Sequence, residues 1–328
     1  MERIVLWGAV KRTAMYFDWL YEKFEIVAIV SDKRQQNSYH GIDIIGRDRI
    51  KDYDFDRIVI TLENSDIEAA IGKICAVDEA YRQKAVTLDQ ISHGTNDIES
   101  YFDYVSSRQL GVIDELLNAT DEEITDFDWM LKRVRHYGIF CFQSDWMKMD
   151  NGISWAVYGL QQIPEEFAAF CNHISKLEVN SAIEVGVYRG RSAFFICAIL
   201  AMKNRNLTYK MVDIYDRIDD FKLFKAKLPQ LEKCIPSCSD DYKGQAFDFV
   251  FIDADHSYDA SIRDFNNVGQ YGKVVTAFHD IYAHEYDHEN GGTVRMWQEV
   301  LDRTSDERHF VFSQYPDKWM GIGVVEWR

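Results

Sequence analysis

The chain has 328 residues, of which 47% are hydrophobic, and a formal net charge of −17 at pH 7. The hydrophobic share is enough for a buried core and excludes a disordered chain. The acidic balance, 54 Asp and Glu against 37 Lys and Arg, argues against a nucleic-acid binder and against docking on an anionic membrane. We therefore expect neither nucleic acid nor a membrane among the partners.

Targeting patterns and cysteine usage bear on location. The longest nearly apolar run, 193–202, is about half as long as a membrane-spanning helix. Residues 1–5 lack the basic-then-apolar pattern of a secretory signal. The six scattered cysteines are typical of reduced thiols rather than of a disulfide framework. These features predict a cytoplasmic protein, and the length predicts two domains.

Strand and helix patterns alternate over the first part of the chain. Strands are predicted at 4–7, 25–30, 42–45, 57–61 and 85–88, with helices at 13–24 and 65–82. Such alternation is typical of a parallel sheet with crossover helices. We expect residues 1–95 to form a small Rossmann-like α/β domain.

Residues 96–150 are predicted to be a helical connector followed by an aromatic segment. Helical periodicity indicates helices at 97–118 and 120–136. The second opens with Thr120-Asp121-Glu122-Glu123, a capping-box pattern. The segment 139–152 is aromatic-rich and irregular, and we expect it to cover the acceptor pocket or to pack in the core or at a domain interface.

A second alternating pattern occupies residues 151–328. Strands are predicted at 182–185, 209–212, 233–235, 247–252, 273–278, 309–314 and 320–327, with helices at 164–177, 192–203, 218–231, 258–271 and 294–303. The last two strands have no room for a crossover helix and must be an antiparallel pair. The expected fold is α/β: a seven-stranded, mostly parallel Rossmann-like sheet with an antiparallel last strand.

Polar residues follow the strands of this second pattern. The first strand leads into EVGVYRGRS at 184–192, where Gly186 and Gly190 allow a tight turn before a helix N-terminus. The second strand ends at Asp213, about where a carboxylate would bind ribose hydroxyls. Because ligands bind at the carboxyl ends of parallel strands, this edge is the expected binding site.

With these features, residues 181–328 resemble the class I S-adenosylmethionine-dependent methyltransferases. Three segments place the resemblance in a bacterial small-molecule O-methyltransferase group: FDFVFIDADHSY at 247–258, KVVTAFHDI at 273–281 and GGTVRMW at 291–297. The resemblance implies S-adenosylmethionine as the cofactor. The glycine turn at 184–192 would hold the methionine end of the cofactor. Asp213 would bind the ribose, and residues 237–240 would flank the adenine. The implied cofactor-binding residues are Glu184, Gly186, Tyr188, Gly190, Ser192, Asp213, Ser239 and Asp253.

The acceptor end of the site is expected where the fourth and fifth strands end. Asp253 and His256 follow the fourth strand, and His279 and Asp280 the fifth, so these side chains should lie close together. The resemblance implies a metal set of Asp253, His279 and Asp280, with Mg²⁺ or Mn²⁺. His279 stands where relatives have oxygen, so two carboxylates without it, or no metal, stay open. His256 resembles a general base and, with Asp253, is the catalytic candidate.

The function that follows is O-methylation of a small polar acceptor, such as a sugar or a nucleotide-linked sugar, in surface-polysaccharide or natural-product assembly. Two alternatives stay open: N-methylation without a metal, and a non-catalytic scaffold that binds S-adenosylmethionine. Asp253, His256, His279 and Asp280 together argue against the scaffold.

A second metal pattern occurs at 284–288, where HEYDH satisfies the zinc-protease signature. That motif requires a helix to bring both imidazoles to one metal. Its acidic and glycine-rich surroundings instead predict a polar loop at the mouth of the acceptor site. Cys234 and Cys238 have no second pair, so thiols are expected there rather than zinc.

The opening of the chain, LWGAVKRT at 6–13, resembles the nucleotide-binding fold of bacterial surface-sugar biosynthesis proteins. Only Gly8 remains of the expected glycines, although Asp32 ends the second strand. We therefore expect docking or dimerisation rather than nucleotide binding, and a homodimer is left open. Lys11 and Arg12 at a helix N-terminus keep a phosphate as an alternative.

Overall fold

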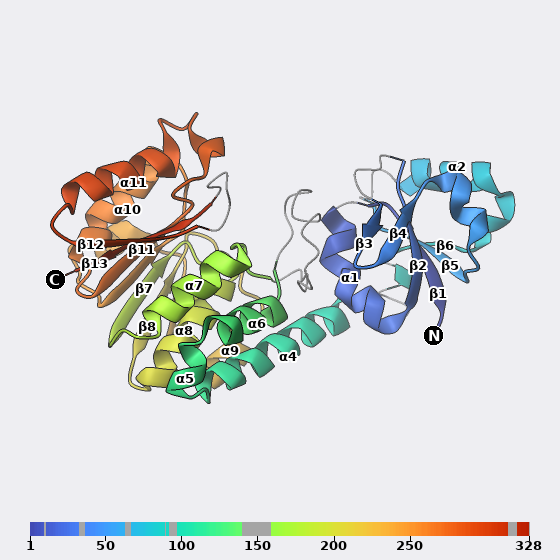
Figure 1. The fold of residues 1–328 in the computed structure, drawn as a ribbon. Helices are drawn as coiled ribbons and strands as arrows, with labels where there is room; N and C mark the ends of the chain where they lie inside the picture. Colours follow the sequence, from blue (N-terminus) through green and yellow to red (C-terminus); the bar gives the residue numbers. More distant parts are fainter. Residues whose placement is uncertain are drawn as a thin grey trace. The chain divides into compact units, whose positions relative to one another are not determined.

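The computed structural model describes residues 1–9, 11–32, 37–62, 67–88, 90–91, 97–139, 159–313 and 320–327. The chain divides into two compact units (Figure 1). Unit 1 comprises Met1–Gln109 and Arg135–Gln161, and unit 2 comprises Leu110–Val134 and Gln162–Arg328. Apart from Ile139, the aromatic segment expected at 139–152 lies outside the described residues.

Unit 1 is built on a six-stranded sheet in the order β3-β4-β2-β1-β5-β6. Its pairs are parallel except β3–β4. The expected parallel sheet is confirmed, and the short strand β3 is an addition. The strands are β1 (Arg3–Trp7), β2 (Glu25–Val30), β3 (Ser38–Tyr39), β4 (Ile42–Ile45), β5 (Arg57–Ile60) and β6 (Ala85–Thr87), and the crossover helices are α1 (Lys11–Lys23) and α2 (Ile67–Val77).

The connector contains α4 (Asp97–Leu117), α5 (Asp121–Ile124) and α6 (Phe127–Tyr137). The capping box at Thr120 and Glu123 is confirmed by reciprocal hydrogen bonds. The single helix expected at 120–136 is wrong, because the Asp126 carboxylate accepts the Trp129 N–H at 2.6 Å and begins a new helix.

Unit 2 carries a seven-stranded sheet in the order β12-β13-β11-β10-β7-β8-β9. Strand β13 runs antiparallel to both its neighbours, and the other pairs are parallel. This confirms the mostly parallel sheet with an antiparallel last strand. The strands are β7 (Ser181–Val185), β8 (Thr208–Val212), β9 (Leu231–Cys234), β10 (Phe249–Ile252), β11 (Val275–His279), β12 (Arg308–Phe312) and β13 (Ile322–Glu326).

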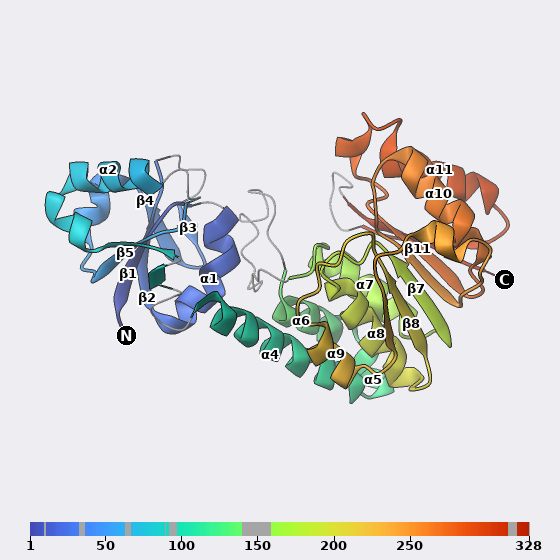
Figure 2. The ribbon, with the colours of Figure 1, turned by 180° about the vertical axis from the view of Figure 1, so that it is seen from behind.

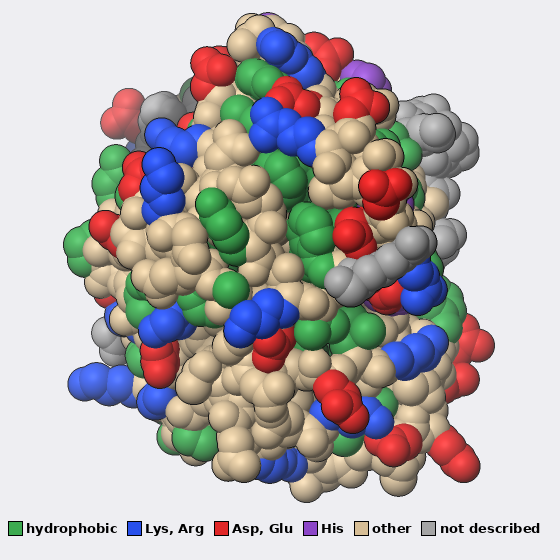
Figure 3. Space-filling view, turned by 90° about the vertical axis from the view of Figure 1, so that its left-hand side faces the viewer, with side chains coloured by type: hydrophobic (Ala, Val, Ile, Leu, Met, Phe, Trp, Pro, Cys, Tyr) green, Lys and Arg blue, Asp and Glu red, His purple; other side chains and the backbone are tan. Residues whose placement is uncertain are grey.

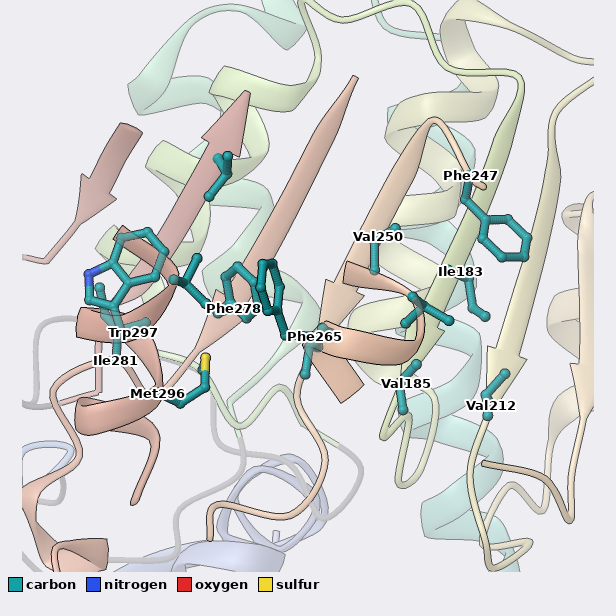
Figure 4. Packing of buried hydrophobic residues seen from close by; sticks show 14 residues of the cluster. Ile183, Val185, Val212, Phe247, Val250, Phe265, Phe278, Ile281, Met296 and Trp297 are labelled. Carbon is teal, nitrogen blue, oxygen red and sulfur yellow. The ribbon is translucent and has the colours of Figure 1, made fainter. Parts of the chain in front are cut away.

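Helices cover both faces of this sheet (Figure 1, Figure 2). Phe265 of α10 and Trp297 of α11 pack on strand residues such as Ile183 and Phe278 (Figure 4). On the other face, Phe170 of α7 stacks on Phe251 with ring centroids 5.5 Å apart. Both faces are therefore apolar, as a parallel sheet requires. The helices are α7 (Pro164–Ile174), α8 (Arg191–Lys203), α9 (Phe221–Lys227), α10 (Tyr258–Asn267) and α11 (Gly292–Arg303).

The helix expected at 218–231 is wrong in its length. Helix α9 covers only Phe221–Lys227, and Leu228 leaves the helical conformation. The reason is Pro229, because the residue before a proline is disfavoured in the helical region. The chain is released early enough for β9 to begin at Leu231.

The surface agrees with a chain rich in both charges. On the face in Figure 3, acidic and basic side chains lie interspersed. Among the described residues, no helix combines the length and apolar character that crossing a membrane requires.

Candidate active site

The carboxyl ends of β7, β10 and β11 meet at one edge of the sheet in unit 2. The register pairs Ile252 of β10 with Val185 on one side and with Phe278 on the other. The Asp253 N–H donates to the Val185 carbonyl at 2.9 Å. The polar residues that follow these strands are therefore neighbours in space, as parallel-sheet geometry predicts.

The turn after β7 lies directly against the end of β10. Gly186 has φ +91°, and a Cβ added there would lie 2.1 Å from the Asp253 carbonyl oxygen. Gly190, with φ +78°, immediately precedes α8. The turn thus depends on glycine for both its conformation and its close contact.

Glu184 is fully buried behind this turn. The Ser192 hydroxyl donates to one carboxyl oxygen at 2.5 Å, and the Tyr209 hydroxyl donates to the other. Burial raises the pKa of Glu184 to about 8, against the opposing effect of the two hydroxyls. Sequence reasoning missed Tyr209. The observed register pairs Tyr209 with Ala182 and so places it on the same face of the sheet as Glu184.

Replacing Glu184 with glutamine should flatten the pH dependence of unit 2 stability. The raised pKa keeps Glu184 protonated in the folded state, whereas in the unfolded chain it ionises near its ordinary 4.5. The wild-type free energy of unfolding therefore falls as pH rises from about 4.5 to 8. At pH 9, the free energy of unfolding of Glu184→Gln should exceed that of wild type by roughly 2–5 kcal/mol. Urea unfolding at pH 5.5, 7 and 9 measures this. The exposed Glu178→Gln is the control, and parallel curves for wild type and Glu184→Gln would contradict the role of burial.

Asp213 follows β8 and holds the turn in place. Its carboxylate accepts the backbone N–H of Tyr188 at 2.8 Å and that of Tyr215 at 2.9 Å. Tyr188 adopts a left-handed φ of +47°, which this hydrogen bond helps to maintain. Asp213, which is predicted to bind the ribose, is thus hydrogen-bonded to the turn that is predicted to hold the methionine end of the cofactor.

Ser239, predicted to bind the cofactor, makes side-chain hydrogen bonds to α10. Its buried hydroxyl donates to Asp264 of α10 at 2.6 Å and lies 3.0 Å from the Asn267 amide nitrogen, which donates to it. Burial raises the pKa of Asp264 to about 6. These contacts hold Ser239 against α10.

The four acceptor-end residues form one cluster. His279 Nδ1 lies 3.2 Å from Asp253 Oδ1 and 3.4 Å from Asp280 Oδ2. His256 Nε2 lies 3.0 Å from the same Asp280 oxygen and 3.9 Å from Asp253 Oδ1. The structure therefore brings together all the residues predicted for this end.

Charges in the cluster stabilise one another. Burial acts to raise the pKa of Asp253, but the charges of His279 and His256 and the hydrogen bond from His279 hold it well below its ordinary value. Burial acts to lower the pKa of His279 and of His256, and the two carboxylates raise both. The cluster thus pairs anionic carboxylates with basic imidazoles.

A metal ion would find ligands here. Asp253, His256 and Asp280 present ligand atoms that all lie within 4.8 Å of one another. This group contains His256 where the sequence predicted His279. His279 Nδ1 faces the two carboxylates instead, and its buried Nε2 has no hydrogen-bond partner among the described residues. Two carboxylates with one imidazole form a mixed oxygen and nitrogen set, which suits Mn²⁺ better than Mg²⁺.

The loop after β11 lies beside this cluster. Its Tyr286 ring packs on the His256 ring with centroids 4.4 Å apart. The HEYDH pattern lies in this loop, and its residues His284–Tyr286 form a short 3-10 turn. His284 contacts the Asp287 carboxylate, whereas the His288 ring contacts a backbone carbonyl. The two exposed imidazoles are therefore not directed at one metal.

In unit 1, other side chains of the chain contact Gly8 and Asp32 at the corresponding strand ends. A Cβ on Gly8 would lie 2.7 Å from a Leu62 methyl group. Asp32, after β2, lies 2.9 Å from Lys73 Nζ and 3.6 Å from Arg47 Nε, and the Lys73 hydrogen bond lowers its pKa. The side chains of Lys11 and Arg12 lie outside the described residues.

Two family models match parts of the chain. Residues 1–82 match a family described as C2185-like, N-terminal. Residues 183–281, which include the glycine turn and the acidic cluster, match a family described as a methyltransferase domain. The chain matches no curated protein.

Solved structures with similar folds include an O-methyltransferase from Bacillus cereus in complex with SAH, 14% identical over 47% of this chain and 77% of that one, with a TM-score of 0.38. The O-methyltransferase TomG from Streptomyces achromogenes, in complex with SAM, is 16% identical over 50% and 80%, with a TM-score of 0.37. The SAH-bound Podospora anserina methyltransferase PaMTH1 is 12% identical over 70% and 97%, with a TM-score of 0.39.

Proposed function

We propose that unit 2 is an S-adenosylmethionine-dependent methyltransferase that transfers the methyl group to an oxygen of a small polar acceptor, such as a sugar or nucleotide-linked sugar. One observation carries the proposal. The glycine turn and the cluster of Asp253, His256 and Asp280 meet at one sheet edge, within the segment that matches a methyltransferase domain. Binding of SAH, the demethylated product, tests the cofactor, and a methyl-transfer screen over sugar nucleotides tests the acceptor.

The cofactor is assigned along the strand ends from β10 to β8. Its methionine end lies at the turn of Gly186 and Gly190, close to Ser192 and the Glu184 carboxyl behind it. Its ribose lies at Asp213, whose carboxylate already accepts hydrogen bonds from the turn backbone. A cationic sulfonium and ammonium are favoured near the carboxylates of Asp213 and Asp253.

Methyl transfer needs an acceptor oxygen that loses its proton, aligned behind the methyl carbon. In the proposed step, the acceptor hydroxyl gives its proton to His256, and its oxygen bonds to the methyl carbon. The carbon–sulfur bond breaks with its electron pair on sulfur, which leaves neutral SAH. Asp280 lies 3.0 Å from His256 Nε2 and would stabilise the imidazolium that forms.

A divalent cation fits the same cluster through Asp253, Asp280 and His256. It would supply a positive charge that holds the acceptor oxygen and lowers its pKa. In the base role, His256 Nε2–H donates to Asp280 and the other ring nitrogen takes up the proton of the acceptor. As a metal ligand, Nε2 would have to lose that hydrogen, so it cannot hold a metal while it donates to Asp280. We propose that His256 is the base and that a metal would bind the two carboxylates. Loss of methyl transfer in the presence of a chelator would show that the metal is used.

Replacing His256 with alanine should lower turnover by roughly 10²–10⁴-fold, the usual effect of losing a general base. SAH affinity should stay near wild type, because His256 is placed at the acceptor end. Initial rates with and without added Mn²⁺ and chelator measure this, with exposed His284→Ala as the control. Recovery of activity by excess Mn²⁺ would show a ligand role, and unchanged turnover would exclude both roles.

For unit 1 we propose docking or dimerisation in a surface-polysaccharide or natural-product pathway, rather than nucleotide binding. Leu62 lies against Gly8, and the Asp32 carboxylate is paired with Lys73, which supports this choice. A cytoplasmic location and a division at 1–95, 96–150 and 151–328 remain part of the proposal.

A further inference from the structure

Gln162 touches the proposed catalytic carboxylate and was not among the residues singled out in the sequence. It lies just before α7, ninety-one positions from Asp253 in the chain, and is 3% exposed. Its Nε2 donates to Asp253 Oδ2 at 3.1 Å. The other oxygen, Oδ1, faces His279 and His256. Gln162 therefore holds one side of Asp253, and the imidazoles hold the other.

The orientation of the Gln162 amide follows from its partner. A carboxylate only accepts hydrogen bonds, so the nitrogen of the amide must face Asp253. The amide oxygen, Oε1, is then left buried, and it has no hydrogen-bond partner among the described residues. Buried carbonyl oxygens without a donor are uncommon, and each calls for a ligand or water.

The position of Asp253 indicates which donor is missing. The Asp253 backbone touches the turn at Gly186, where the methionine end of the cofactor is assigned. The Asp253 carboxylate, which Gln162 already contacts, favours a cationic donor here. The cofactor carries one at that end, an ammonium group with three N–H bonds.

We propose that Gln162 is a positioning residue for Asp253 through Nε2 and binds the cofactor's ammonium group through Oε1. The inference rests on the proposed function and extends it to a residue outside the predicted set. It accounts for both polar atoms of a buried side chain, one satisfied within the protein and one only in the complex.

Calorimetric titration of the full chain with two probes tests this. SAH carries the ammonium group, whereas 5′-methylthioadenosine keeps the nucleoside and sulfur but lacks the amino-acid end. Gln162→Leu should weaken SAH binding by about tenfold or more, the effect of losing a hydrogen bond to a charged group. It should leave 5′-methylthioadenosine within about twofold of wild type. The neighbouring Gln161→Leu is the matched control and should change neither affinity.

If Gln162 had only a structural role, Gln162→Leu would weaken the binding of both probes together or of neither. Either result would overturn the inference. Gln162→Met retains more side-chain flexibility and repeats the comparison if the leucine variant does not fold, as thermal unfolding will show. If wild type binds neither probe, the proposed function itself fails. If wild type binds SAH and the variants keep the wild-type ratio of affinities for SAH and 5′-methylthioadenosine, only the role of Gln162 fails.

Discussion

Replacing Gly186 with alanine is expected to destabilise unit 2 by about 3–5 kcal/mol and to weaken SAH binding on the order of 100-fold or more. The added Cβ would lie 2.1 Å from the Asp253 carbonyl oxygen, which is backbone and cannot move aside alone. A left-handed φ of +91° adds a second cost. Relief of the clash has to separate the turn from β10, which displaces the cofactor site and the acceptor site from each other.

Gly244 provides the matched control for this variant. It also has a left-handed φ, +76°, but a Cβ there would meet nothing within 4 Å. Gly244→Ala should therefore cost only the conformational part, about 1–2 kcal/mol, and leave SAH affinity unchanged. Urea unfolding and calorimetry measure both variants. Equal effects of the two substitutions would mean that close contact between the turn and β10 is not what the site depends on.

Replacing Asp253 with asparagine should lower methyl transfer by roughly 10³-fold, within the range for losing a group that acts with a base. Asparagine keeps the shape but removes the negative charge that both imidazoles face. The pKa of buried His279, now raised by Asp280 and Asp253, would fall, so the cluster would lose its charge pairing. SAH affinity should change less than turnover, because the turn geometry is retained.

The control for this variant lies two residues further along the chain. Asp255 accepts the Ser257 N–H at 2.8 Å and lies outside the cluster of Asp253, His256 and Asp280. Asp255→Asn should leave turnover within about twofold of wild type. A similar loss in both variants would indicate damage to the loop rather than loss of a catalytic charge.

Strand ends could be predicted from the sequence because one rule governs them. Parallel strands finish at the same edge, so Asp213, Asp253 and Asp280 had to meet near the glycine turn, whatever the details of packing. The antiparallel pair β12 and β13 followed from loop length alone. Local signals also located the capping box at Thr120.

Side-chain partners far apart in the chain could not be predicted in this way. Gln162 and Asp253 are joined only through tertiary packing, and Tyr209 reaches Glu184 only in the observed strand register. Which imidazole, that of His256 or that of His279, groups with Asp253 and Asp280 as a metal set depends on side-chain placement, which spacing along the chain does not encode. The end of α9 before Pro229 was predictable, by contrast, and shows a local rule overriding helical periodicity.

Calorimetric titration with SAH and S-adenosylmethionine, with and without Mn²⁺, tests the central claim most directly. Wild type should bind both at one equivalent per chain, and Gly186→Ala should bind neither measurably at the same concentrations. Binding of SAH that persists without Mn²⁺ would show that the cofactor site does not require the metal. Failure of wild type to bind either compound would contradict the assignment of the glycine turn and Asp213 as a cofactor site, and with it the proposed methyltransferase.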